Sequence, residues 1–121
     1  MDFVFVAIGG AIGAMGRYWV SRQLPQSADS FPFATLIVNG VGALLIGIFM
    51  GLIAVKPAFS SFRPLLVTGL LGALTTYSTF AFESVLLWTN GHSLLAIGNV
   101  LANTLLCLIL AALGYTLRSF F

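Results

Sequence analysis

The residues best suited to chemistry in this 121-residue chain gather in one stretch, GLLGALTTYSTF, which runs from Gly69 to Phe80. It contains two glycines and, soon after them, four threonine and serine residues within five positions. Glycine weakens a helix, and threonine and serine side chains compete for its backbone hydrogen bonds. An unwound segment offers carbonyl oxygens to a small cation, and N–H groups and hydroxyls to an anion. The stretch therefore predicts a broken helix with ion-binding chemistry.

Two aromatic residues in the same stretch have a spacing that allows a second kind of contact with an anion. Tyr77 and Phe80 are three positions apart, so they share a face if the chain is helical there. The edge of an aromatic ring is positive, and it stabilises a dehydrated anion weakly, without trapping it. Ordinary packing of the two rings is the alternative.

Polar residues recur every four positions in two other apolar stretches. One stripe begins with Thr35 and Asn39 and continues through small residues, and the other contains Asn99, Asn103 and Cys107. Positions four apart share a helix face, and neutral amides and hydroxyls contact an ion without a charge that would trap it. Two such stripes favour a shared polar path. For Asn39 alone, an interhelical hydrogen bond and a pore ligand are equal alternatives.

Charged residues within the apolar stretches are few. Arg17 lies near the far end of the first, where it either extends to the membrane surface or lines a water-filled vestibule that attracts anions. Glu83 lies within the third, and a carboxylate inside a membrane is costly enough to be a functional candidate. We expect it near a water-filled mouth or paired with an arginine, and His92 exposed in a short loop.

The composition indicates which elements must position these residues. The chain is 60% hydrophobic and 7% charged, whereas a soluble domain averages about 25% charged residues. It is therefore an all-α integral membrane protein of one domain, residues 1–121. A membrane helix needs roughly 20 apolar residues. Four segments qualify, at about 3–24, 33–55, 64–88 and 93–117. The break in the third falls at mid-membrane.

The basic residues are almost evenly divided between the two ends of such a bundle. Four spans place both termini on one side, together with Lys56, Arg63 and Arg118, and leave Arg17 and Arg22 on the other. Orientation in a membrane follows the asymmetry of Lys and Arg between loops. Near balance predicts dual topology, in which two opposed copies pair about an axis in the membrane plane. A parallel oligomer is the alternative.

Several function classes are disfavoured. The net charge of +2 comes without a basic cluster, so nucleic acid is not an expected partner. The single cysteine, Cys107, forms no internal disulfide. The N-terminal stretch starts with Asp2 and has no basic region, so we expect a retained first span and no signal peptide. An enzyme is not expected, because the motifs for a metal cluster, a nucleophile–base pair or a phosphate loop are lacking.

Four motifs together resemble the Fluc (CrcB) fluoride channels of bacteria. They are GGAIGAMGRY in the first span, TLIVNGVGALLIG in the second, GLLGALTTYSTFAFE in the third and GNVLANTLL in the fourth, so the resemblance covers essentially the whole chain. It implies a passive fluoride channel in the bacterial plasma (inner) membrane, built as a dual-topology antiparallel homodimer with two pores. It also implies a structural sodium ion held by the backbone carbonyls of Gly72 and Thr75. It places the fluoride path at Thr35, Asn39, Tyr77, Ser78, Phe80, Asn103 and Cys107, with Arg17 in the vestibule.

Three positions depart from the usual family pattern, in which the core is similar to GxxGGLTTFSTF. Tyr77 stands where phenylalanine is usual, Ala73 replaces a glycine, and Cys107 replaces a pore-lining serine. These changes keep open a heterodimer with a paralogous subunit. A further alternative is a proton-coupled exporter similar to the small multidrug resistance family, which has a similar length and topology. Those proteins depend on a glutamate in the first span, where this chain has only Asp2 at its start.

Overall fold

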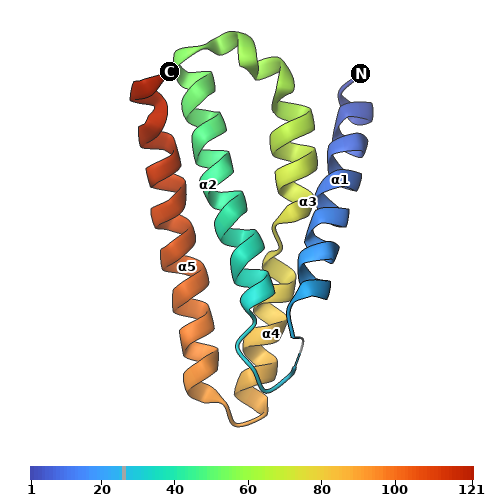
Figure 1. Ribbon diagram of the computed structural model, residues 1–121, viewed down its shortest axis with the longest axis vertical. Helices are drawn as coiled ribbons and strands as arrows, with labels where there is room; N and C mark the ends of the chain where they lie inside the picture. The colour runs from blue at the N-terminus through green and yellow to red at the C-terminus, as the bar shows by residue number, and fades with distance from the viewer. Residues whose placement is uncertain (26) are drawn as a thin grey trace.

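The computed structural model describes residues 1–25 and 27–121; Gln26, in the predicted loop between the first two spans, lies outside the described residues. Over these described residues the fold is all-helical, and four helices are long and apolar enough to cross a membrane (Figure 1). Their bounds are Asp2–Gln23, Phe33–Val55, Pro64–Thr89 and Ser93–Phe120, within three residues of the predicted spans. The prediction of four membrane-spanning segments is therefore confirmed as far as length and composition decide it.

The third segment is divided into shorter pieces. It begins as a π-helix, η2 (Pro64–Leu71), continues as the short α3 (Gly72–Leu74), and resumes as α4 (Tyr77–Thr89). The residues between α3 and α4 are not helical. The other three segments are α1 (Asp2–Gln23), α2 (Phe33–Val55) and α5 (Ser93–Thr116), which ends in the 3-10 helix η3 (Leu117–Phe120). The second connection forms the 3-10 helix η1 (Pro57–Phe62).

Glycines bring α1 into close contact with the first part of the third segment. A Cβ added to Gly13 would meet the backbone oxygen of Leu70, and one added to Gly69 would meet the backbone oxygen of Val6. Side chains at these positions would hold the helices apart, so the glycines permit backbone contact, as small residues do between membrane helices. This contact fixes the height of α1 against the helix break.

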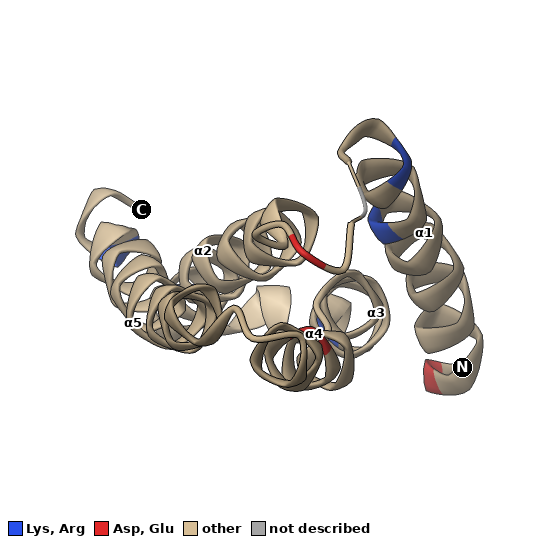
Figure 2. Ribbon diagram, turned by 90° about the horizontal axis from the view of Figure 1, so that it is seen from below, with Lys and Arg blue, Asp and Glu red and all other residues tan. Residues whose placement is uncertain are grey.

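The stripe of small residues in α2 does the same against α5. A Cβ on Gly47 would meet the backbone oxygen of Ala111, and one on Gly114 would meet the backbone oxygen of Leu44. These glycines therefore permit backbone contact between α2 and α5. Two close pairs result, α1 with η2 and α2 with α5, and α4 also packs on α5. Seen along the bundle, α1 lies at the edge, beside α3 (Figure 2).

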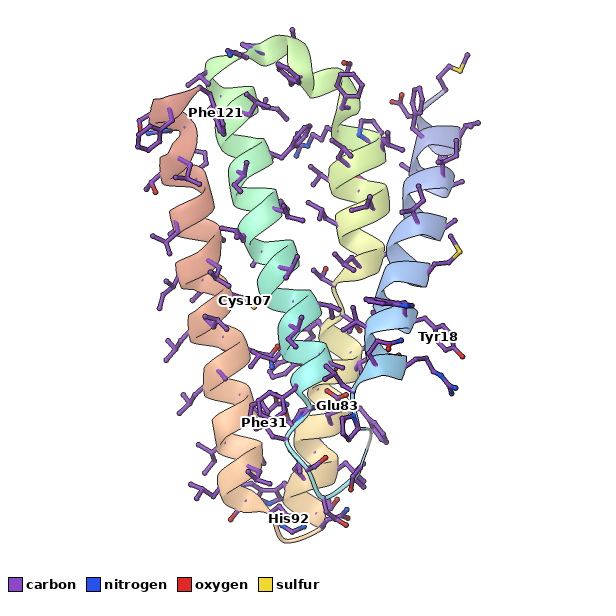
Figure 3. The ribbon with its side chains drawn as sticks, in the orientation of Figure 1. Tyr18, Phe31, Glu83, His92, Cys107 and Phe121 are labelled. Carbon is purple, nitrogen blue, oxygen red and sulfur yellow. The ribbon has the colours of Figure 1, made fainter. Side chains whose placement is uncertain are left out.

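Both chain termini lie at the same end of the bundle, as four spans require (Figure 1). At the opposite end, contacts join the α1–α2 loop to the α4–α5 turn. The Asn90 side chain donates through Nδ2 to Asp29 Oδ1 over 3.2 Å, and His92 Nε2 lies 3.2 Å from the same oxygen. His92 is half-buried at this end of the molecule (Figure 3). The turn between α4 and α5 contains Gly91 with a φ of 85°, a conformation that favours glycine.

Candidate functional site

The centre of the site is the break between α3 and α4, where Thr75 and Thr76 adopt extended backbone angles. Thr76 caps α4, because its hydroxyl oxygen accepts from the Thr79 N–H over 3.3 Å. The same Thr76 hydroxyl lies 2.9 Å from Thr79 Oγ1. Threonine is a favoured residue at this capping position. The predicted polar stretch therefore ends one helix and starts the next.

The break removes the usual helical donors from two carbonyl groups. In a regular helix the Thr76 N–H would donate to the Gly72 carbonyl, and the Thr79 N–H to the Thr75 carbonyl. Instead, Thr76 N–H donates to Asn39 Oδ1 over 2.8 Å, and Thr79 N–H donates to the Thr76 hydroxyl. The oxygens of Gly72 and Thr75 are thereby released from those two bonds. Released carbonyls of this kind can hold a cation.

Asn39, on α2, holds the extended segment in place. Its side chain pairs with both backbone groups of Thr76: Oδ1 accepts from the N–H, and Nδ2 donates to the carbonyl oxygen over 3.2 Å. Nδ2 also donates to Asn103 Oδ1 on α5 over 3.0 Å. Asn39 thus makes interhelical hydrogen bonds, one of its two predicted alternatives.

Arg17 supports the other side of the break. Its Nε donates to the Ala73 carbonyl over 3.1 Å, across 56 positions of sequence. Ala73 is in the last turn of α3, where carbonyls lack intrahelical partners and a positive charge is favourable. Arg17 on α1 and Asn39 on α2 therefore hold the two ends of the same break.

An open groove of about 530 Å³ runs along one face of the break. Tyr77 is 79% exposed there, whereas Phe80 is 8% exposed. Their ring centroids are 5.4 Å apart with an interplanar angle of 65°, an edge-on contact. The predicted shared face is confirmed. Of the predicted site residues, the groove is lined by Asn39, Gly72, Thr75, Tyr77, Phe80, Asn103 and Cys107.

A second cavity, of about 330 Å³, lies on the other side of the break, toward α1. It is lined by Arg17, Thr35 and Glu83, among others. The Thr35 hydroxyl donates to Glu83 Oε1 over 2.8 Å, while Glu83 Oε2 is buried and has no hydrogen-bond partner among the described residues. Figure 3 shows Glu83 on α4, at a different height of the bundle from Cys107 on α5. Thr76 lines both cavities, so it forms part of the wall between them.

The structure thus divides the predicted site residues into two groups. Arg17 and Thr35 line the second cavity, and the groove holds most of the others. Ser78 is exposed and lies 3.5 Å from the Thr76 hydroxyl. The predicted site residues of the two stripes therefore line cavities on both sides of the break.

Sequence reasoning placed Thr76 in the predicted break and Asn99 in a polar stripe without assigning either to the site, and it did not single out Ser84. Asn99 is fully buried and donates to the Ser84 hydroxyl over 2.9 Å. The signal for Asn99 was its place four positions before Asn103, on the same helix face. Ser84 carried no signal, since a serine that bonds back to its own helix is common in membrane segments.

Comparison with known proteins gives the chain a family. Residues 4–115 match the family described as "CrcB-like protein, Camphor Resistance (CrcB)". This chain belongs to the CrcB family. Proteins similar to it include "Fluoride-specific ion channel FluC" of Shewanella loihica, 43% identical, and of Shewanella oneidensis, 44% identical, each over 96% of this chain and 94% of the relative. The same-named protein of Shewanella pealeana is 42% identical over the same shares.

The family resemblance predicted from the four motifs is therefore confirmed. CrcB membership leaves the exporter alternative without support, because the three Shewanella relatives are named as ion channels. The departures at Ala73, Tyr77 and Cys107 are placed at or near the break: Tyr77 and Cys107 line the groove, and Ala73 accepts the hydrogen bond of Arg17.

Proposed function

We propose that this chain is the subunit of a passive fluoride channel in the bacterial inner membrane, which lowers cytoplasmic fluoride. The observation that carries the proposal is the 43% identity, over 96% of the chain, to relatives named fluoride-specific ion channels. Fluoride enters cells as neutral HF, dissociates near neutral pH and is trapped as the anion. A channel then lets the membrane potential drive the anion outward.

The main barrier to passage is removal of water from a small, strongly hydrated anion. The site offers neutral groups to replace that water: the exposed Ser78 hydroxyl and the edges of the Tyr77 and Phe80 rings. Several weak contacts suit rapid conduction better than one tight site, because the ion must also leave. We assign Thr35, Asn103 and Cys107 to the polar lining on either side of the break, and Arg17 to the attraction of anions into the second cavity.

We propose that two copies pair in opposite orientations. In a single copy the groove beside the break is open and largely apolar, and an inverted second copy would cover it. The near balance of basic residues between the two ends of the bundle supports insertion in either orientation. The channel would then have an inverted-repeat architecture, and the break would lie at mid-membrane, where the copies cross.

The residues at the break fit a structural sodium ion. The carbonyls of Gly72 and Thr75 have lost their helical donors to Asn39 and Thr76, and both residues line the groove. Carbonyl oxygens of unwound helices are suitable ligands for Na⁺. We propose that these two carbonyls, with their counterparts in the second copy, hold the ion. A bound cation would supply a fixed positive charge near the anion path.

A liposome assay tests the channel function. Vesicles that contain the purified protein should release their fluoride load faster than protein-free vesicles with the same load. They should release little chloride under the same conditions. Fluoride release no faster than that from protein-free vesicles would refute a homomeric fluoride channel. Fluoride release that appears only after co-reconstitution with a paralogous subunit would favour the heterodimer.

A further inference from the structure

A row of buried and half-buried polar groups leads away from the break and returns to it. The row starts at the Thr76 N–H, which donates to Asn39 Oδ1 over 2.8 Å. Asn39 Nδ2 then donates to Asn103 Oδ1 over 3.0 Å, which takes the row from α2 to α5. Asn103 Nδ2 donates to Asn99 Oδ1 over 2.8 Å, one turn away on the same helix.

The row then leaves α5 and ends on α4. Asn99 Nδ2 donates to the Ser84 hydroxyl oxygen over 2.9 Å, and that hydroxyl donates to the Phe80 carbonyl over 2.8 Å. Asn99 is 0% exposed and Asn103 is 5% exposed, so water does not compete for the bond between them, whereas Asn39 and Ser84 are half-buried. We call this row the amide chain; its members, in order, are Thr76, Asn39, Asn103, Asn99, Ser84 and Phe80.

The two ends of the amide chain fix its direction. An amide side chain is nearly symmetric in shape, so its hydrogen-bond partners decide which end is oxygen and which is nitrogen. The Thr76 N–H can only donate, which forces Asn39 to present its oxygen there and its nitrogen to the next residue. The Phe80 carbonyl can only accept, which forces the Ser84 hydroxyl to use its one hydrogen there. Every amide between these ends is then held in one orientation.

The amide chain also uses up the donors of Asn39. One Nδ2 hydrogen goes to the Thr76 carbonyl and the other to Asn103 Oδ1. Because a side-chain amide has two N–H groups, Asn39 has none left for an anion. Asn39 borders the groove, but its donors hold the break, whereas the hydroxyl of Ser78 is exposed.

We propose that Asn99 and Ser84 are positioning residues, which act through the amide chain to fix the direction of the Thr76 peptide. Neither residue lines the groove or the second cavity, so neither touches the proposed ion path directly. The effect of Asn99 and Ser84 on ion passage rests on the proposed function, but their effect on the orientation of the Thr76 peptide does not. In this arrangement the donors of Asn39 support the break, and the exposed Ser78 hydroxyl and the ring edges remain available to the anion.

The test measures hydrogen–deuterium exchange of the Thr76 backbone amide by NMR, on intact protein in lipid nanodiscs. Ser84→Ala removes the hydroxyl near the end of the amide chain, and Asn99→Leu replaces an amide in its middle with an apolar side chain of similar size. Loss of a hydrogen bond worth about 1 kcal/mol corresponds to about fivefold faster exchange, which we expect for both variants. Ser84→Thr keeps the hydroxyl and should exchange as the wild type does. Thr104→Val removes a hydroxyl from α5 outside the chain and should also leave Thr76 exchange unchanged.

The outcomes separate this inference from the channel function. Unchanged Thr76 exchange in Ser84→Ala, in protein that elutes and melts like the wild type, would overturn the inference. If Asn99→Leu does not fold, the milder Ser84→Ala and Ser84→Thr pair decides. Fluoride release from the same samples should fall in Ser84→Ala and be retained in Ser84→Thr. If the wild type releases no fluoride, the channel proposal fails, while the exchange result still stands on its own.

Discussion

Two glycines on α1 give a test of how closely this helix approaches the third segment. A Cβ built on Gly13 would meet the Leu70 carbonyl oxygen and lie 3.0 Å from the Leu74 nitrogen, whereas one on Gly10 would meet no atom of the described residues within 4 Å. The atoms opposite Gly13 belong to backbone, so they cannot swing aside as a side chain would. Gly13→Ala must therefore push α1 away, and Gly10→Ala need not.

The size of the effect follows from a comparison of the two variants. Each exchange of glycine for alanine gains about 1 kcal/mol in helix propensity, and this gain cancels between them. Overpacking costs about 1–3 kcal/mol. We therefore expect the free energy of unfolding of Gly13→Ala to lie about 1–3 kcal/mol below that of Gly10→Ala.

The assay is equilibrium unfolding in mixed detergent micelles, followed by helical circular dichroism, with fluoride release measured on the same preparations. Fluoride release should fall in Gly13→Ala, because a displaced α1 carries the Arg17 side chain away from the Ala73 carbonyl. Gly10→Ala should release fluoride like the wild type. Equal unfolding free energies for the two variants would refute the close approach of α1.

Three further substitutions test single contacts. Arg17→Lys keeps the charge but loses the Nε donor to Ala73, so fluoride release should fall; undiminished release would mean that only the charge matters. Thr35→Val removes the donor to Glu83, so the free energy of unfolding should fall by about 1 kcal/mol, seen as a lower melting temperature. Adding Glu83→Gln to this variant should restore part of the lost stability. An unchanged melting temperature in Thr35→Val would contradict a stabilising hydrogen bond. Tyr77→Phe keeps the edge-on ring contact and removes a hydroxyl at an exposed position, so fluoride release should rise; an unchanged rate would place the hydroxyl clear of the path.

The sequence was sufficient to predict the four apolar segments and the break between them. Length and hydropathy decide the segments, because lipid leaves the backbone few alternatives to a helix. The break was predictable because Thr75 and Thr76 follow weakening glycines and bring side chains that replace backbone bonds. The glycine contacts of α1 and α2 were likewise visible as small residues at helical spacing.

The contacts that hold the break were not predictable in the same way. Asn39 carries the same spacing signal whether it faces an ion or another helix, and only its partners on Thr76 and Asn103 distinguish the two. The hydrogen bond from Arg17 joins residues 56 positions apart, so it depends on how α1 docks. The π-helical start of the third segment, at Pro64–Leu71, has no signal that we recognise in the sequence.

The two close helix pairs have a consequence for how the chain is assembled during synthesis. The partners are the first with the third segment and the second with the fourth, so neither pair joins neighbours in sequence. When α1 enters the lipid its glycine face has no partner until η2 has been made and inserted. The first two segments therefore lack their main helix contacts after insertion, and the bundle packs only when the third and fourth segments have been inserted. A nascent chain arrested after α2 would expose both glycine faces to lipid and to the cell's membrane quality control.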